Sequence, residues 1–222
     1  MLYNALVRAY GQYCSVAKAL DLIGDRWNLL IVRELLLRGP CRYTDLLQGL
    51  PGIASNMLTD RLRDLERGGV VSREDAPPPV ATTLFELTDR GQQLKPILRA
   101  LGEWGAQLMG EPAAGDEFRS HWLALPVSMY LADPPPQASP VTIELQIGEE
   151  PVTIETVGGA VRTRRGPAAD PDLVLNGAPE LVLGLLSERL SLAEARARGL
   201  GCSGDVAKLR RLRARPEAAV AG

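Results

Sequence analysis

The order of turn signals and periodic segments over residues 15–109 constrains the fold of this chain most strongly. Apolar residues recur at helical spacing from Val16 to Leu35, which predicts one helix capped by Ser15 and ended by the Gly-Pro pair at residues 39–40. A short helix is expected over residues 43–48. The break "GLPG" separates it from a helix over residues 55–67, with Ser55 as the expected N-cap.

Two β-rich runs follow the next Gly-Gly break. They cover residues 70–75 and 82–88, and the Pro-rich loop "APPPVA" between them is typical of a hairpin with a long connection. Thr88 then opens a long amphipathic helix that runs to residue 109. A winged helix-turn-helix domain has this order of elements: helix, helix, turn, helix, hairpin, helix. In such a domain the helix after the turn enters a DNA groove.

The chain changes character after this segment. Residues 110–117 are small, polar and aperiodic, which predicts a linker. Beyond it, a mostly apolar helical stretch over residues 118–133 precedes a hairpin of the runs "VTIELQIG" and "VTIETVGG", two further strands, one or two helices opened by Pro179, and a last helix over residues 205–215. We expect an α+β chain with a winged helix-turn-helix domain at residues 1–109 and a second domain at residues 118–222, built on a mostly antiparallel sheet with helices.

Composition limits the classes of function. The chain has 222 residues, one histidine, three cysteines and a hydrophobic fraction of 45%. The odd, widely spaced cysteines (Cys14, Cys41 and Cys202) favour a reducing cytoplasm over a disulfide framework. With His121 as the single histidine and no close Cys pair, we expect no metal site and no cofactor. We also expect no membrane span and no secretory signal.

The charge balance requires any DNA contact to come from a local face. The formal charge is +1 for residues 1–110 and -3 for residues 111–222, which together give the net charge of -2. On a helical wheel of residues 55–67, Leu58, Leu62 and Leu65 form a narrow apolar stripe. Opposite this stripe lie Asn56, Thr59, Asp60, Arg63 and Arg67, and Arg61 lies on the flank.

This polar face offers amide, hydroxyl and guanidinium groups, the types that read base edges and clamp phosphates. Asp60 either accepts from a cytosine amine or pairs with Arg63 or Arg67. The alternative is the solvated face of any amphipathic helix. The neighbouring short helix, which begins with Arg42 and Tyr43, and the hairpin, which carries Arg73, favour DNA binding.

The segment "CSVAKALDLIGDRWNLLIVRELLLRGPCRYTDLLQGLPGIASNMLTDRLRDLERGGVVSRE", with "FELTDRGQQLKPILRALGEWG", resembles the HxlR family of bacterial winged-helix transcription factors. The resemblance covers about residues 12–109. It implies a homodimer, assembled through the N-terminal segment and the helix at residues 88–109, on a near-palindromic operator. It places Ser55, Asn56 and Thr59 at the bases, and Arg42, Tyr43, Arg61 and Arg63 nearer phosphate. The loop "APPPVA" departs from the family's usual wing, so a minor-groove contact by its tip is not carried over.

Cys14 raises a second possibility, because in some family members the cysteine at this position senses quinones, aldehydes or oxidants. Such sensing needs a thiolate, which a helix N-terminus favours, and Cys14 directly precedes an expected helix start. The alternative is a buried structural thiol.

The segment "DLVLNGAPELVLGLLSERLSLAEARARGLGCSGDVAKLRRL" resembles the sterol carrier protein type-2-like domain, over about residues 118–215. This resemblance implies an apolar cavity for a hydrophobic or aromatic small molecule. The expected lining consists of Trp122, Leu125, Met129, Tyr130, Val182, Leu183 and Leu186. The alternative is that these residues fill one another in a solid module. Three arginines, Arg162, Arg164 and Arg165, are expected on a solvated strand edge.

These observations predict a cytoplasmic, homodimeric transcriptional regulator that binds double-stranded operator DNA and responds to a hydrophobic small molecule. The first alternative is a thiol-based regulator acting through Cys14. The second is an enzyme or lipid carrier that also carries a winged helix, but no catalytic set is readable around His121 or the scattered carboxylates.

Overall fold

The computed structural model describes residues 9–77, 82–132 and 139–212, and the chain divides into two compact units, residues 1–101 and 102–222. The boundary lies within one helix, ahead of the linker predicted at residues 110–117. No described helix has the length and apolar character that crossing a membrane requires.

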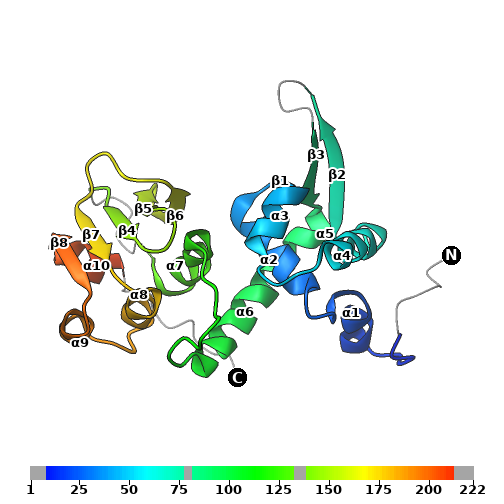
Figure 1. Ribbon diagram of the computed structural model, residues 1–222, viewed down its shortest axis with the longest axis horizontal. Coiled ribbons are helices and arrows are strands. Elements are labelled where there is room, and N and C mark those ends of the chain that lie inside the picture. Colours follow the sequence, from blue (N-terminus) through cyan, green and yellow to red (C-terminus); the bar gives the residue numbers. More distant parts are fainter. Residues whose placement is uncertain (1–8, 78–81, 133–138, 213–222) are drawn as a thin grey trace. The chain divides into compact units, whose positions relative to one another are not determined.

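The first unit has the predicted winged helix-turn-helix order (Figure 1). Its elements are α1 (Ser15–Ile23), α2 (Asn28–Arg38), β1 (Cys41–Arg42), α3 (Tyr43–Gly49), α4 (Ser55–Arg67), β2 (Val71–Ala76), β3 (Thr82–Leu87), α5 (Asp89–Gln92) and α6 (Lys95–Gly105), which runs through the unit boundary. The strands pair antiparallel in the order β1-β3-β2. The short strand β1 was not expected from the sequence. Figure 1 shows β2 and β3 projecting beyond the helices of this unit as the wing. Residues 78–81, which belong to the predicted loop "APPPVA", lie outside the described residues.

Three helix predictions need correction. The first helix is interrupted between α1 and α2, where Asp25 Oδ1 accepts a hydrogen bond from the backbone N–H of Trp27 and the side chain of Asn28 donates to the carbonyl of Leu22. These local bonds replace the helical ladder. The predicted helix over residues 88–109 is likewise divided, into α5, α6 and the 3-10 turn η1 (Ala106–Leu108), although Thr88 caps α5 by accepting from Gly91 N–H at 3.1 Å.

The third correction concerns α4. Its N-cap is Ala54, which has extended backbone and no side chain able to cap, and Ser55 is the first helical residue. The turn before it contains Gly52 with φ 81°, a left-handed conformation that glycine adopts without steric cost.

The core of the first unit lies between the helices and the three-stranded sheet. Leu58, Leu62 and Leu65 are buried in it, as the helical wheel predicted, and Trp27 packs against it. This unit also holds a fully buried carboxylate, Glu34, which accepts from Arg33 at 2.9 Å and from Arg38 at 3.2 Å. Opposite charges compensate the cost of burying this carboxylate.

The second unit is a sheet with helices. After η1 come the 3-10 turn η2 (Ser120–Leu123), α7 (Ala124–Tyr130), β4 (Thr142–Gln146), β5 (Val152–Val157), β6 (Ala160–Arg165), β7 (Leu173–Asn176), α8 (Pro179–Leu186), α9 (Leu192–Ala197), β8 (Gly201–Gly204) and α10 (Val206–Leu212). The strand order is β6-β5-β4-β7-β8, and only β4 and β7 pair parallel. The mostly antiparallel sheet is therefore confirmed, as is Pro179 in the first turn of α8.

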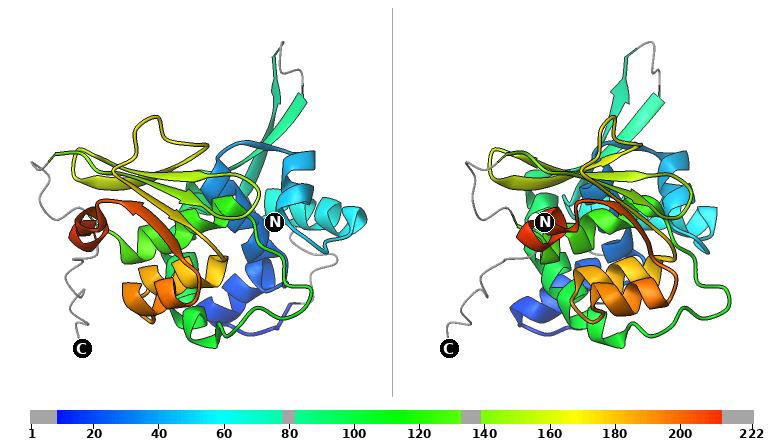
Figure 2. Two further views of the ribbon diagram at one scale, coloured as in Figure 1. Left: turned by 60° about the vertical axis from the view of Figure 1, so that its left-hand side comes forward. Right: turned by 90° about the vertical axis from the view of Figure 1, so that its left-hand side faces the viewer.

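Helices α7, α8 and α9 gather on one side of this sheet (Figure 2). The core between them contains Ile143 and Leu145 from β4 and Leu173 and Leu175 from β7, all fully buried. Strand β6 forms one edge, and its arginines are exposed there as predicted. Arg164 pairs with Glu155 at 3.1 Å and Arg165 pairs with Glu150.

Candidate nucleic-acid interface

The outward face of α4 is polar and solvent-exposed. Asn56, Asp60 and Arg63 are exposed on the side opposite the buried leucine stripe, and Ser55 is exposed at the start of the helix. Met57 also belongs to this face with 38% of its surface exposed, and the sequence interpretation did not include it. An apolar side chain among polar ones is suited to contact a thymine methyl group.

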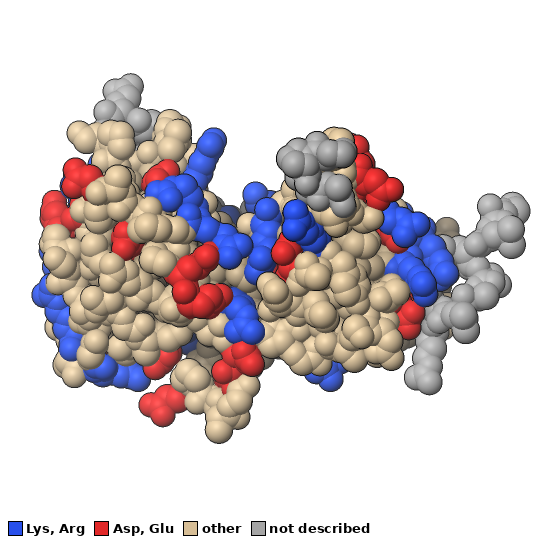
Figure 3. All heavy atoms as spheres, turned by 45° about the horizontal axis from the view of Figure 1, so that its top comes forward, with Lys and Arg blue, Asp and Glu red and all other residues tan. Residues whose placement is uncertain are grey.

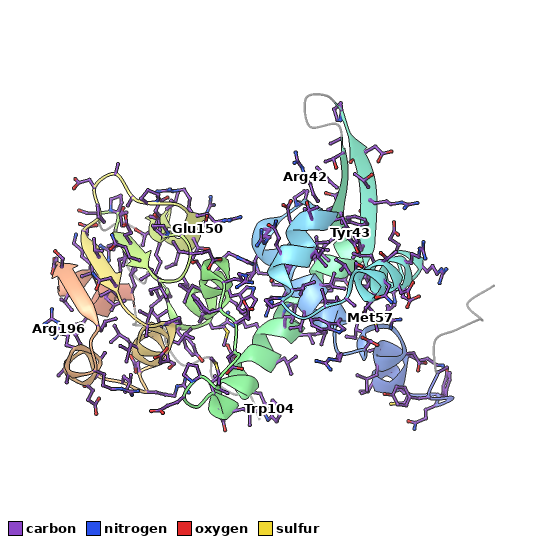
Figure 4. All side chains as sticks on the ribbon, viewed as in Figure 1. Arg42, Tyr43, Met57, Trp104, Glu150 and Arg196 are labelled. Carbon is purple, nitrogen blue, oxygen red and sulfur yellow. The ribbon has the colours of Figure 1, made fainter. Side chains whose placement is uncertain are left out.

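Tyr43 connects the first turn of α4 to α3. Its hydroxyl donates to the backbone carbonyl oxygen of Ser55 at 2.6 Å and lies 3.3 Å from Thr59 Oγ1. Thr59 Oγ1 also donates to the Ser55 carbonyl, at 3.0 Å. Figure 4 shows Tyr43 and Met57 in the part of the unit formed by α3 and α4. The hydroxyls of Tyr43 and Thr59 therefore fix the start of α4 against the preceding helix.

Arg61 is engaged inside the unit. One terminal nitrogen pairs with Asp25 at 3.0 Å and the other with Asp64 at 3.2 Å, and Nε is buried without a partner among the described residues. Asp25 lies in the loop between α1 and α2, so the Asp25–Arg61 pair ties that loop to α4. Sequence reasoning missed Asp25, because a contact across 36 positions leaves no local signal.

The other arginines of α4 are more exposed. Arg63 pairs with Asp60 at 3.6 Å, with side chains 62% and 59% exposed. Arg67 pairs with Asp64 at 3.3 Å. Exposed ion pairs of this kind contribute little to the free energy of folding, and a DNA phosphate readily replaces the carboxylate as the partner of the arginine.

Two further candidates flank α4. Arg42 is exposed directly before α3, where its backbone N–H donates to Asp45 Oδ2 at 3.0 Å (Figure 4). Arg73 on β2 pairs with Glu66 of α4 at 3.2 Å. Acidic and basic side chains are mixed over the face drawn in Figure 3, so a phosphate contact relies on individual arginines.

The residues expected to line a cavity in the second unit lie in and around its core. Val182 and Leu186 are fully buried, and Tyr130 and Leu183 pack against the same core. Trp122 is half-buried, with its ring edge-on to Phe118 at 6.3 Å between centroids. The side chains of Leu125 and Met129 lie next to Gly102, where an added Cβ would come within 3.2 Å of the Met129 sulfur.

Cys14 is the N-cap of α1 and is exposed. The backbone N–H groups of Ala17 and Val16 lower the pKa of its thiol. Cys41 is buried and directs its thiol to the Gly39 carbonyl, and Cys202 is half-buried. Within the described ranges, no three His, Cys, Asp or Glu side chains gather in a way that would hold a metal ion.

A three-stranded sheet with a projecting wing, a short positioning helix and an exposed polar helix define a winged helix-turn-helix protein. The family described as HxlR-like helix-turn-helix matches residues 22–112, and the chain belongs to this family through its N-terminal part. The second unit lies almost entirely outside the match.

Three relatives are named HTH-type transcriptional regulators. The protein sll1512 of Synechocystis is 35% identical over 43% of this chain and 70% of its own length. YvaP of Bacillus subtilis is 37% identical over 40% of this chain and 82% of its own. YodB of Bacillus subtilis is 33% identical over 40% of this chain and 79% of its own length. The solved structure of reduced YodB is 31% identical, has a TM-score of 0.39, and covers 46% of this chain and 100% of its own. The chain is thus a transcriptional regulator of the HxlR type and not an enzyme.

Proposed function

We propose that the chain binds a near-palindromic operator as a homodimer, with one α4 helix from each copy in successive major grooves. Ser55, Asn56 and Thr59 contact bases, with Asp60 beside them. The phosphate contacts come from Arg42, Arg63 and Arg73. Tyr43 holds the start of α4 through its bond to the Ser55 carbonyl, and Arg61 holds α4 against the α1–α2 loop. The observation that carries this proposal is the exposed polar face of α4 on a helix whose first turn is fixed by Tyr43.

The dimeric state is supported by apolar side chains that remain exposed in the single chain. On α1, Val16 is 64% exposed and Leu20 is 42% exposed. On α6, Ile97 and Leu101 are exposed at a spacing of one helical turn, followed by Trp104 (Figure 4). Apolar helix faces of this kind mark protein–protein contacts. The N-terminal residues 1–8, which belong to the expected dimerisation segment, lie outside the described ranges.

The test of DNA binding starts from a duplex that the full chain selects from a random pool, followed by fluorescence anisotropy. Asn56→Ala is expected to relax base preference and Arg63→Ala to weaken binding to all duplexes. Lys95→Ala removes an exposed charge from α6 and serves as the control. Unchanged affinity and base preference in both α4 variants would exclude α4 as the recognition helix.

We assign effector binding to the second unit and propose that it has a sterol-carrier-like architecture. In this proposal the functional domains are residues 1–109 and 118–222. Its order of strands and helices from β7 to α10 agrees with that assignment. A ligand there shifts the population of operator-binding conformations by its difference in affinity for them, typically about 1–3 kcal/mol. Titration of hydrophobic metabolites into the operator complex tests this coupling, and a bound metabolite that leaves operator affinity unchanged would refute it.

A thiol switch at Cys14 is the second candidate function, favoured by its exposure and by the lowered pKa at the start of α1. The Cys14 thiolate adds to a quinone ring carbon. A carbon–sulfur bond forms, and the quinone takes up the electron pair and a proton to become a substituted hydroquinone. Operator affinity after treatment with 1,4-benzoquinone, compared between wild type and Cys14→Ser, tests it. An equal response in both proteins removes this candidate.

A further inference from the structure

A pocket of about 200 Å³ opens on the surface of the second unit, apart from most of the residues expected to line a cavity. It lies between the segment after η1 and the helices α8 and α9. Its principal lining residues are Met109, Glu111, Glu180, Leu183, Leu190 and Arg198. Of the cavity residues expected from the sequence, only Leu183 contributes to it.

Arg189 holds one wall of this pocket in place. Its Nη1 donates to the backbone carbonyls of Ala106 and Met109, at 3.0 Å each, and its Nε donates to Ser187 Oγ at 3.1 Å. The preceding residue, Glu188, has φ 59°, a left-handed conformation that is uncommon outside glycine. This turn brings the Arg189 guanidinium to the end of η1 and fixes the segment that carries Met109.

The apolar floor is also preformed. Leu190 packs so closely on Gly184 that an added Cβ there would lie 2.7 Å from Leu190 Cδ1. The backbone N–H of Leu190 donates to the Gly184 carbonyl at 3.0 Å, which closes the turn after α8. Leu183 and Leu190 therefore present a fixed apolar surface to a ligand in this pocket.

Two side chains of opposite charge are available at this floor. Arg198 lies 3.9 Å from the carboxylate of Glu111, whose side chain is 91% exposed. Its charge also acts on Glu194, one turn earlier in the chain. Glu180 is half-buried in the first turn of α8, and its carboxylate makes no ion pair or hydrogen bond with the described part of the chain. This carboxylate is therefore available to pair with a cationic group of a ligand.

We propose that this pocket binds a small apolar amino acid. Its carboxylate pairs with Arg198 in place of Glu111, its ammonium pairs with Glu180, and its side chain packs on Leu183 and Leu190. Sites for drug-sized ligands measure roughly 300–1,000 Å³, so this smaller pocket suits a single amino acid better than a sterol or a fatty acyl chain. The inference rests on the proposed effector role of the second unit.

Isothermal titration calorimetry of the full chain with L-leucine tests the proposal, with isocaproate and isoamylamine as analogues that lack the ammonium and the carboxylate. Each analogue is expected to bind at least about tenfold more weakly, as for the loss of a hydrogen bond to a charged group. Arg198→Gln and Glu180→Gln should each weaken L-leucine binding about tenfold or more. Arg196→Gln, which changes an exposed arginine of α9 outside the pocket, should leave it unchanged (Figure 4).

The proposal is overturned if L-leucine, L-valine and L-phenylalanine all fail to bind at millimolar concentration. It is equally overturned if isocaproate or isoamylamine binds as well as L-leucine, or if the two pocket variants behave like Arg196→Gln. Operator binding is measured separately on the same proteins without amino acid. Its absence in the wild type would refute the proposed regulator function, while the calorimetry would still decide the pocket.

Discussion

The hydroxyl of Tyr43 in α3 lies 2.6 Å from the backbone carbonyl oxygen of Ser55, the first residue of α4. This bond joins the positioning helix to the start of the helix that carries the proposed base contacts. The orientation of Asn56 and Thr59 therefore depends on a side chain outside their own helix.

Replacing Tyr43 by Phe removes this hydrogen bond and keeps the ring. We expect the free energy of unfolding to fall by about 1 kcal/mol, the usual net contribution of one hydrogen bond, and operator affinity to fall with it. Urea unfolding and fluorescence anisotropy measure the two effects. Tyr13→Phe, at a fully exposed tyrosine, is the control, and equal values for both variants would contradict the role of Tyr43.

Arg63→Ala should weaken binding to all duplexes to a similar extent and reduce the slope of log affinity against log salt by about 1, because one phosphate contact is lost. Asp60→Asn should strengthen binding to all duplexes and increase this slope, since Asp60 pairs with Arg63 in the free protein. Anisotropy titrations over a range of salt concentrations give both slopes. A loss in Arg63→Ala confined to one operator sequence would indicate a base contact instead.

Glu34→Ala should strongly destabilise the first unit. The change removes a fully buried carboxylate that accepts from Arg33 and Arg38, and breaking a buried ion pair costs about 3–5 kcal/mol. Differential scanning calorimetry of the full chain measures the shift in the transition of this unit. Glu74→Ala, at an exposed position of β2, should leave that transition in place.

Cys14 should react as a thiolate at lower pH than an ordinary thiol. Hydrogen bonds from the Ala17 and Val16 backbone lower its folded-state pKa, so the rate of alkylation should stay high as the pH falls to values that protonate a free thiol. In denaturant, where α1 is lost, the midpoint should move up to the ordinary value. Mass spectrometry of iodoacetamide-labelled peptides measures both midpoints, and coincident midpoints would contradict the effect of the helix start.

Leu20→Glu and Leu101→Glu should each shift the chain from dimer to monomer, because a carboxylate would have to be buried in an apolar contact. Size-exclusion chromatography with light scattering measures the mass. Val157→Glu places the same charge at an exposed apolar position of β5 and should not change it. A dimer that persists in both helix variants would place the interface elsewhere.

The sequence by itself determined the order of the elements and the limits of several of them. The leucine spacing of residues 58, 62 and 65 gave the buried side of α4 and, by exclusion, its polar face, because a helix repeats every 3.6 residues. Alternating runs located β4 and β5, and Pro179 marked the start of α8. These signals are local, since they arise from the geometry of neighbouring residues in the chain.

Only the tertiary structure decided which side chains meet. The interruption between α1 and α2, the Ala54 cap, the Tyr43 bond to α4 and the Asp25–Arg61 pair depend on partners that packing brings together. The pocket at Arg198 likewise combines residues from three segments of the chain, and a left-handed turn at Glu188 helps to form it. Periodicity specifies which face of an element is buried, but the free energy of a contact between distant residues has no counterpart in the local pattern of the sequence.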